Sequence, residues 1–421
     1  MKKLFVTATV LFFVLALVSV SSATNGYFSH GFSIKNEGLA GTGVALPLDS
    51  LATSMNPAGM AFVGTRIDVG LNVFNPNRGY TVSGNPSGFP RTFGLEPGTV
   101  ESDSEWFVIP AFGANKMLNE NSSLGIAIFG NGGMNTNYDK RTFGDPTSTR
   151  TGVDLMQLFV TPTYAVKLHP KHAIGVSAIL AYQSFEAKGL RSFAGFSSDP
   201  SKLSNNNHDS SYGYGARFGY LGEVFPNLFL GASYQTNIWM SRLGDYKGLF
   251  AEQGDFDIPQ NWTVGLAFKA TPALTFAADV QKIYYSDVKA INNPLLPNLA
   301  TSRLGDDNGA GFGWKDMTVF KAGVQWESSD VWTWRAGYSY GEQPIDGSQV
   351  LFNILAPGVV QNHVTAGFTR KIGKSQGIDF ALMHAFSHSV LGPNPLEVPG
   401  QQTIRLRMNQ WEASVGYSWT F

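Results

Sequence analysis

The chain has 421 residues, of which 43% are hydrophobic and 14% charged, with a formal net charge of −1 and no cysteine. This composition excludes a disordered chain and a disulfide-stapled one. The balanced charge provides no basic surface for nucleic acid, so nucleic-acid binding is excluded too.

The first 23 residues have the pattern of a secretory signal peptide. Lys2 and Lys3 precede an apolar run from Leu4 to Val20, and Ser21–Ala23 supplies small residues for cleavage. An uncleaved membrane anchor is the alternative. After this leader no apolar stretch of about 18 residues recurs, which excludes a helical membrane protein.

The next segment, residues 24–64, is predicted to be a plug. It is rich in Gly, Ala, Ser and Asn and shows neither a helical nor a strand period. A segment this short offers too little apolar surface to offset the entropy of ordering it alone. It therefore needs a cavity to fold in, and residues 65–421 are predicted to provide that cavity.

From Arg66 onward, apolar and polar residues alternate with the period of a strand. The alternating segments are 67–73, 106–112, 124–128, 156–168, 174–182, 212–220, 228–234, 262–268, 274–280, 320–326, 332–338, 364–368, 380–386 and 411–421. An even number of strands, joined alternately by short turns and long loops, is typical of an antiparallel transmembrane β-barrel.

Two soluble all-β folds, a sandwich and a propeller, show the same period. Aromatic residues near the strand ends favour a membrane interface instead. The last strand ends with Tyr417, Trp419 and Phe421 on one face, which resembles the signal that the barrel assembly machinery of the bacterial outer membrane recognises. An ordinary final strand is the alternative.

The plug contains NEGLAGTGVA and then SMNPAGMA, and the alternating strands that follow end in a terminal Phe. This arrangement resembles the FadL/TodX family of outer-membrane transporters for long-chain fatty acids and other hydrophobic compounds. The resemblance implies a 14-stranded barrel with a hatch that contains Asn56, Pro57 and Ala58. Pro57 fixes a turn, and the Asn56 side chain can bond nearby backbone. The turn either gates the hatch or only folds it.

The third strand runs into Gly130, Asn131, Gly132 and Gly133. Glycines inside a strand favour a bulge or a bend. The family resemblance implies an inward kink here that opens the wall sideways, so that an apolar ligand leaves into lipid. The alternative is a strand that ends at these residues and becomes a loop.

Strand parity places Lys321 and Arg335 on the lumen side. A buried cation needs a partner, and an anionic ligand head group would serve as one. Lumen carboxylates such as Asp279 or Glu412 are the alternative partners. Arg405 and Arg407 have the outward parity, where lipopolysaccharide phosphates could bind them.

These patterns predict a passive, monomeric outer-membrane channel for hydrophobic small molecules, without cofactor or metal. A structural or adhesive barrel with a permanent plug is one alternative, and an open polar porin is another. The seven His residues are scattered and no metal-ligand spacing occurs, so an enzyme is not expected.

Overall fold

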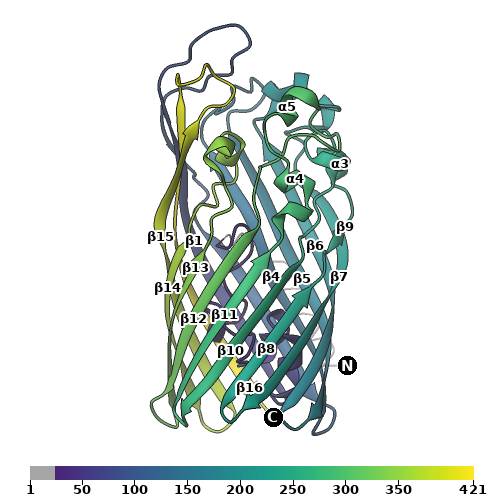
Figure 1. Ribbon diagram of the computed structural model, residues 1–421, viewed down its shortest axis with the longest axis vertical. Coiled ribbons are helices and arrows are strands. Elements are labelled where there is room, and N and C mark those ends of the chain that lie inside the picture. Colours follow the sequence, from purple (N-terminus) through teal and green to yellow (C-terminus); the bar gives the residue numbers. More distant parts are fainter. Residues whose placement is uncertain (1–23) are drawn as a thin grey trace, which may run out of the picture.

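A computed structural model describes residues 24–421, so the predicted signal peptide lies outside the described residues. Fourteen antiparallel strands form a closed barrel, and the segment that follows residue 23 lies in its bore (Figure 1). The ladder between the first and last strands, from Arg66↔Thr420 to Ser83↔Thr403, closes the cylinder. The predicted fold, a 14-stranded barrel with an internal plug, is confirmed.

The barrel strands are β1 (Arg66–Ser83), β3 (Phe107–Met117), β4 (Ser122–Tyr138), β5 (Thr151–His169), β6 (His172–Lys188), β7 (Asp209–Phe225), β8 (Leu228–Gln235), β10 (Asn261–Thr271), β11 (Leu274–Ile283), β12 (Met317–Glu327), β13 (Trp332–Gly341), β14 (Asn362–Ile372), β15 (Gln376–Pro393) and β16 (Thr403–Thr420). Two short strands were not predicted from the sequence. They are β2 (Gly98–Glu101), which pairs with β1, and β9 (Trp239–Met240), which pairs with β7, both at the long-loop end. Neither changes the closure of the barrel.

The wall carries its apolar side chains outside. On β12 and β13, Phe320 is 47% exposed and Trp334 is 44% exposed, whereas Lys321 and Arg335 are buried inside. This arrangement is the reverse of a soluble sheet and suits a wall surrounded by lipid, so the sandwich and propeller alternatives are wrong. In the part of the chain that the structure describes, no helix has the length and apolarity to cross a membrane.

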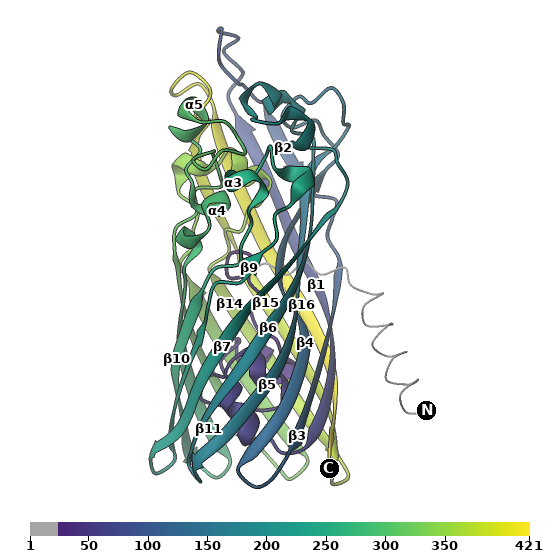
Figure 2. The same ribbon diagram turned by 90° about the vertical axis from the view of Figure 1, so that its right-hand side faces the viewer.

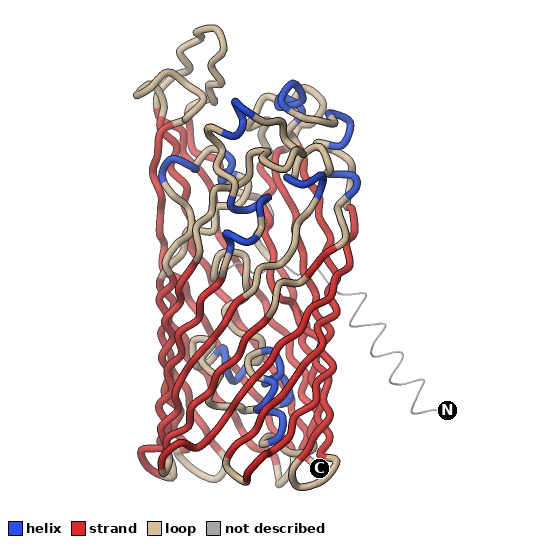
Figure 3. The backbone as a smooth tube through the Cα atoms, turned by 45° about the vertical axis from the view of Figure 1, so that its right-hand side comes forward, coloured by secondary structure: helices blue, strands red, loops and turns tan. Residues whose placement is uncertain are grey.

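The plug, called the hatch below, comprises residues 24–64. It contains α2 (Ile34–Glu37) and the 3-10 helices η1 (Ser50–Ser54) and η2 (Pro57–Ala61), which lie in the half of the bore nearer the short turns (Figure 3). Asp49 and Asn56 begin η1 and η2, because their side-chain oxygens accept from Leu51 N at 3.0 Å and from Ala58 N at 3.1 Å.

Polar side chains of the wall hold the hatch backbone. Asp279 Oδ2 accepts from Gly43 N at 2.8 Å and from Val44 N at 3.1 Å, and Asp68 Oδ2 accepts from Ser50 N at 2.9 Å. The bonds satisfy backbone donors that a largely irregular segment cannot satisfy itself. The hatch is thus folded by the barrel, as its small apolar content requires.

The long loops fold over the other end of the barrel (Figures 1 and 2). They contain short helices, namely η3 (Arg191–Phe196), η4 (Pro200–Lys202), η5 (Gly244–Tyr246), α3 (Ala251–Gly254), η6 (Tyr285–Asp287), α4 (Lys289–Asn292), α5 (Asn298–Thr301), η7 (Gly347–Gln349) and η8 (Phe352–Ile354). Their apolar side chains form a cluster above the hatch.

The close approach of the hatch to the wall gives a first prediction. A Cβ at Gly175 on β6 would lie 2.4 Å from the carbonyl carbon of Pro57 and 2.5 Å from Ala58 N, both of them backbone atoms. Gly175→Val should therefore unseat the hatch while the barrel still forms. Ion conductance in planar bilayers should rise severalfold over wild type, with heat-modifiable migration retained.

Ala178→Val is the matched control, because Ala178 lies on the same strand and its side chain is exposed on the outer wall. This variant should conduct like wild type. A Gly175→Val barrel that stays closed to ions would show that the hatch is not held by this contact.

Candidate functional site

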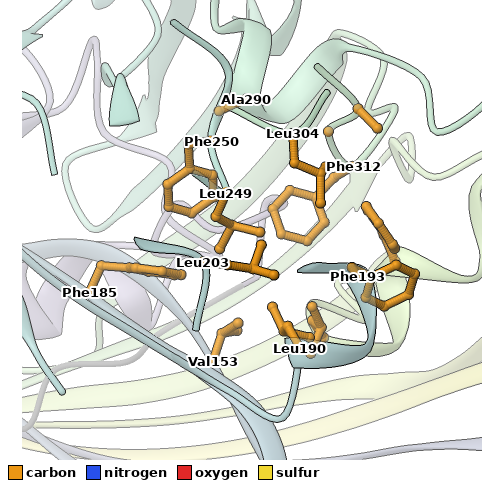
Figure 4. A pocket seen from close by; sticks show the side chains of 14 residues that line it. Val153, Phe185, Leu190, Phe193, Leu203, Leu249, Phe250, Ala290, Leu304 and Phe312 are labelled. Atoms are coloured by element: carbon orange, nitrogen blue, oxygen red, sulfur yellow. The ribbon is translucent and has the colours of Figure 1, made fainter. Parts of the chain in front are cut away.

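An apolar cavity lies under the long loops (Figure 4). Its walls come from β5, β6 and four loops, and all of its side chains are apolar. The lining residues are Val153, Phe185, Leu190, Phe193, Leu203, Leu249, Phe250, Ala290, Leu304, Ala310, Gly311, Phe312, Phe352 and Leu355. A site without a hydrogen-bonding or charged side chain recognises its ligand through apolar contact alone.

The free volume inside this cavity is about 30 Å³. An engineered apolar cavity that holds benzene measures roughly 150 Å³. The structure therefore shows the cavity in a contracted state, and the lining must move apart before a ring-sized molecule enters. Four of the five lining phenylalanines, all except Phe185 on β6, can provide this movement, because they belong to loops rather than to the barrel ladder.

Ion pairs between loops tie the cover of the cavity together. Lys202 Nζ lies 2.5 Å from Asp245 Oδ1, and Lys315 Nζ lies 2.9 Å from Asp346 Oδ2. The hydrogen bond from Lys315 lowers the pKa of Asp346 to about 2. Because exposed ion pairs of this kind contribute little to stability, they can open without a large penalty.

An aromatic cluster lies between the cavity and the first residues of the hatch. The Tyr27 ring centroid lies 5.3 Å from that of Tyr285, 6.1 Å from Trp314 and 6.3 Å from Phe256. Tyr285 also fixes the hatch backbone, since its hydroxyl accepts from Tyr27 N at 3.2 Å and donates to Asn25 O at 2.5 Å. These rings form a continuous apolar surface from the loops to the hatch.

The glycine-rich part of the third barrel strand, β4, contains a break in the wall. The pairing of β4 with β3 stops at Phe112↔Ile128, although β4 continues to Tyr138. On the other edge of β4, the register with β5 shifts between Gly130 and Gly132. The predicted alternative, a strand that ends at these glycines, is wrong. The gap between β3 and β4 is called the window below.

The start of the hatch covers the lower part of the window. Phe28 pairs with Gly132, Ser29 N donates to Asn131 O at 2.9 Å, and Gly133 N donates to Tyr27 O at 2.9 Å. A Cβ at position 132 would lie 1.8 Å from Tyr27 O, so glycine is required there. The hatch thus takes the place that β3 vacates along this stretch of β4.

A row of buried amides continues from the window into the wall. Asn131 Nδ2 donates to Gln157 Oε1 at 3.0 Å, and Gln157 Nε2 donates to Gln183 Oε1 at 2.8 Å. The bonds cross β4, β5 and β6 and stiffen the wall beside the register shift. Gln157 and Gln183 were not predicted as site residues, although their inward parity between apolar outward neighbours is readable in the sequence.

The Asn-Pro-Ala turn lies at the opposite end of the hatch. Asn56 Nδ2 donates to Val44 O at 2.7 Å and to Tyr220 O on β7 at 2.8 Å. Pro57 and Ala58 pack against Gly175. The turn therefore joins two parts of the hatch to the wall and lies away from the window, and its predicted part in gating stays a prediction.

Lys321 and Arg335 contact other residues of the protein at the level of the hatch. Lys321 Nζ lies 3.5 Å from the carbonyl oxygens of His30 and Gly41. Arg335 donates to Gln325 at 2.8 Å and to Thr369 at 2.7 Å. Neither residue lines the apolar cavity.

The carboxylates predicted as alternative partners make their hydrogen bonds to other groups, although Asp279 lies opposite Lys321 in the ladder between β11 and β12. Glu412 accepts from Asn72 at 2.8 Å, and Asp279 accepts from the hatch backbone. Among the described residues, neither Lys321 nor Arg335 forms a direct ion pair with Asp279 or Glu412, so this alternative is wrong. A ligand-binding role for Lys321 and Arg335 stays a prediction.

The terminal strand closes the barrel with its aromatic residues at the short-turn end. Trp419 pairs with Ile67 and Tyr417 with Val69, while Phe421 is 81% exposed. Arg407 is bound to Glu101, and Arg405 is exposed. Recognition by an assembly machinery and contact with lipopolysaccharide stay predictions.

A protein-family model matches most of the chain. Residues 15–394 match the family model described as outer membrane protein transport protein (OMPP1/FadL/TodX). No curated protein matches the chain.

Among solved structures, the toluene transporter TodX of Pseudomonas putida is 20% identical, with a TM-score of 0.68 over 94% of this chain and 100% of that one. A FadL homologue of Pseudomonas aeruginosa is 16% identical, with a TM-score of 0.69 over 94% and 100%. The Ralstonia pickettii toluene transporter TbuX is 18% identical, with a TM-score of 0.62 over 93% and 99%.

The family model covers most of the chain, and the barrel with its internal hatch agrees with the fold of these structures. Members of this family are transport channels of the outer membrane rather than enzymes. The chain belongs to the FadL/TodX family of outer-membrane transport proteins.

Proposed function

We propose that the protein takes up neutral hydrocarbons passively and releases them sideways through the window into the outer leaflet. The observation that carries this proposal is the break between β3 and β4, where the start of the hatch occupies the free edge of β4. Movement of three hatch residues would open a route from the aromatic cluster to lipid.

The route begins at the cavity under the loops. A ligand that parts the phenylalanine side chains gains apolar contact at each step, first in the cavity and then along Tyr27, Tyr285 and Trp314. Release of Tyr27–Ser29 from β4 then exposes the window. Because the cavity and the aromatic cluster are apolar and the window opens to lipid, the ligand never has to re-enter water.

The position of the window supports release into the outer leaflet. The outward side chains of β1 change from Ile67, Val69, Leu71 and Val73 to Asn75 and Asn77 along the strand. The apolar outward side chains of β1 therefore end near residue 74, which pairs with Phe107. The window begins beyond Phe112↔Ile128, and Phe112 pairs with Val69 inside this apolar stretch. The window therefore runs from within the stretch toward the long-loop end, and a molecule leaving here enters the hydrocarbon layer on that side.

The substrate class follows from the lining of the cavity. A fatty acid has a carboxylate that would need a donor or a cation in a buried site, and the cavity offers neither. A neutral hydrocarbon has no such requirement, and five phenylalanines favour an aromatic one. TodX and TbuX, described as toluene transporters, are consistent with this choice.

The proposal also divides the chain into a cleaved leader over residues 1–23, a hatch over 24–64 and a barrel over 65–421. We also infer a monomer that the barrel assembly machinery inserts through its terminal aromatic residues, among outer-membrane lipid and lipopolysaccharide. A permanent plug in an adhesive barrel would need no window.

Locking the hatch to β4 tests the route. The native chain has no cysteine, so the double variant Ser29→Cys with Asn131→Cys contains the only thiols. Its oxidation should hold the hatch start on β4, because the two positions are neighbours in an antiparallel bridge. Uptake of labelled toluene by cells should fall at least tenfold and recover on reduction.

The matched control is Leu124→Cys with Tyr164→Cys, a pair in register between β4 and β5 where the ladder is intact and both side chains are exposed on the outer wall. Oxidation of this pair should leave uptake unchanged. Undiminished uptake by a fully oxidised hatch lock would exclude lateral release through the window.

Ligand binding to the purified barrel tests the substrate class. Toluene should bind saturably and oleate should not, because the cavity has no partner for a carboxylate. Phe312→Gln should weaken toluene binding about tenfold, since an amide without a partner would line the cavity. Phe320→Ala, on the lipid face, is the control and should bind normally.

The same assay tests whether Lys321 or Arg335 binds the head group of an anionic ligand. Lys321→Met and Arg335→Met should leave toluene binding within twofold of wild type, because neither side chain lines the cavity. Tight oleate binding that either substitution abolishes would contradict a neutral substrate and support the head-group role.

A further inference from the structure

Arg78 crosses the upper part of the window. It lies on β1 between the stretch that pairs with β3, which ends at Phe74↔Phe107, and the stretch that pairs with β2, which begins at Gly79↔Glu101. Its side chain points into the barrel and is 4% exposed.

The guanidinium binds β4 directly. Arg78 Nε donates to Asn135 O, and Nη2 donates to Asn135 Oδ1 at 3.2 Å. Nη1 donates to Pro76 O at 2.8 Å, and the group lies 5.5 Å from the centre of the Phe107 ring. Two strands that are not neighbours in the sheet are thus joined by one side chain.

The bond completes a series along the free edge of β4. Asn131 O and Gly133 N bond with the hatch, Asn135 O bonds with Arg78, and Asn137 O accepts from Asp103 N at 2.9 Å. Because a sheet edge beside lipid cannot leave backbone groups unpaired, each of these positions needs a partner. Arg78 supplies the partner for Asn135 O, which neither the hatch nor the chain after β2 reaches.

Arg78 also borders a second, small cavity at the window. Gly26, Met134 and Trp314 line the same space, which connects the aromatic cluster with the break in the wall. A ligand that leaves through the window must pass the guanidinium and the ring of Phe107. The free volume here is about 20 Å³, so the passage is closed while Arg78 holds β4.

We propose that Arg78 is a clasp that keeps the upper part of the window closed and limits the rate of lateral release. The inference depends on the proposed route through the window. Hatch and clasp act on adjacent positions of one edge, so the hatch opens the lower part while Arg78 sets how far β3 and β4 separate. Lysine cannot replace it fully, because a single ammonium lacks the fork that reaches both Asn135 oxygens.

Uptake kinetics of Arg78→Gln test the clasp. The maximal rate of labelled toluene uptake should rise about fivefold, while the concentration for half-maximal uptake stays unchanged, because entry and the cavity are untouched. Arg78→Lys should give an intermediate rate. Arg405→Gln, an exposed charge removal on β16, should behave as wild type.

Heat-modifiable migration first establishes that each barrel is folded. An unchanged or lower maximal rate in folded Arg78→Gln, or a shifted half-saturation concentration, would overturn the clasp. The hatch lock separates this failure from that of the route. If the oxidised lock stops uptake and Arg78→Gln has no effect, only the clasp is wrong. If the oxidised lock also leaves uptake intact, the route itself is wrong.

Discussion

The structure depends on the rule that a backbone polar group facing lipid must have a partner inside the protein. In the described barrel, thirteen of the fourteen pairs of neighbouring strands are joined by a hydrogen-bonded ladder along most of their shared length. The seam between β3 and β4 is the exception. At that seam a hatch segment and one arginine side chain replace the ladder. A partner that is not part of the sheet can leave, which makes this seam the natural place for an opening.

The same rule explains why the hatch can be both folded and movable. Around Asn56 and Gly43 it is bonded to β7 and β11 through buried side chains, and wall glycines let its backbone approach closely. At Tyr27–Ser29 it is held by backbone bonds to β4, by the Tyr285 hydroxyl that accepts from Tyr27 N, and by aromatic contacts. On the proposed route, we expect local opening at this end of the hatch while the part around Asn56 and Gly43 stays seated.

Much of this architecture was readable in the sequence, since period-two alternation and a glycine-rich leading segment dictate a barrel with a filled bore. The glycines at 130–133 predicted a bulge or bend, whereas an opening of the wall there was implied only by the family resemblance. The remaining parts were not readable because they depend on contacts between distant segments. Arg78 looks like any inward polar residue until β3 is seen to be missing beside it, and the apolar cavity is built from loops without periodicity. Lys321 and Arg335 had the correct parity, but their partners are backbone carbonyl, amide and hydroxyl groups that no spacing predicts.

Hydrogen exchange of the purified protein, with and without toluene, tests the central claim most directly. Ligand should accelerate exchange at Ser29 and at Gly133, whose amides bond between the hatch and β4, while the amides of Gly43 and Val44 stay protected. Equal exchange at the window with and without ligand, or loss of protection throughout the hatch, would contradict local opening at this edge.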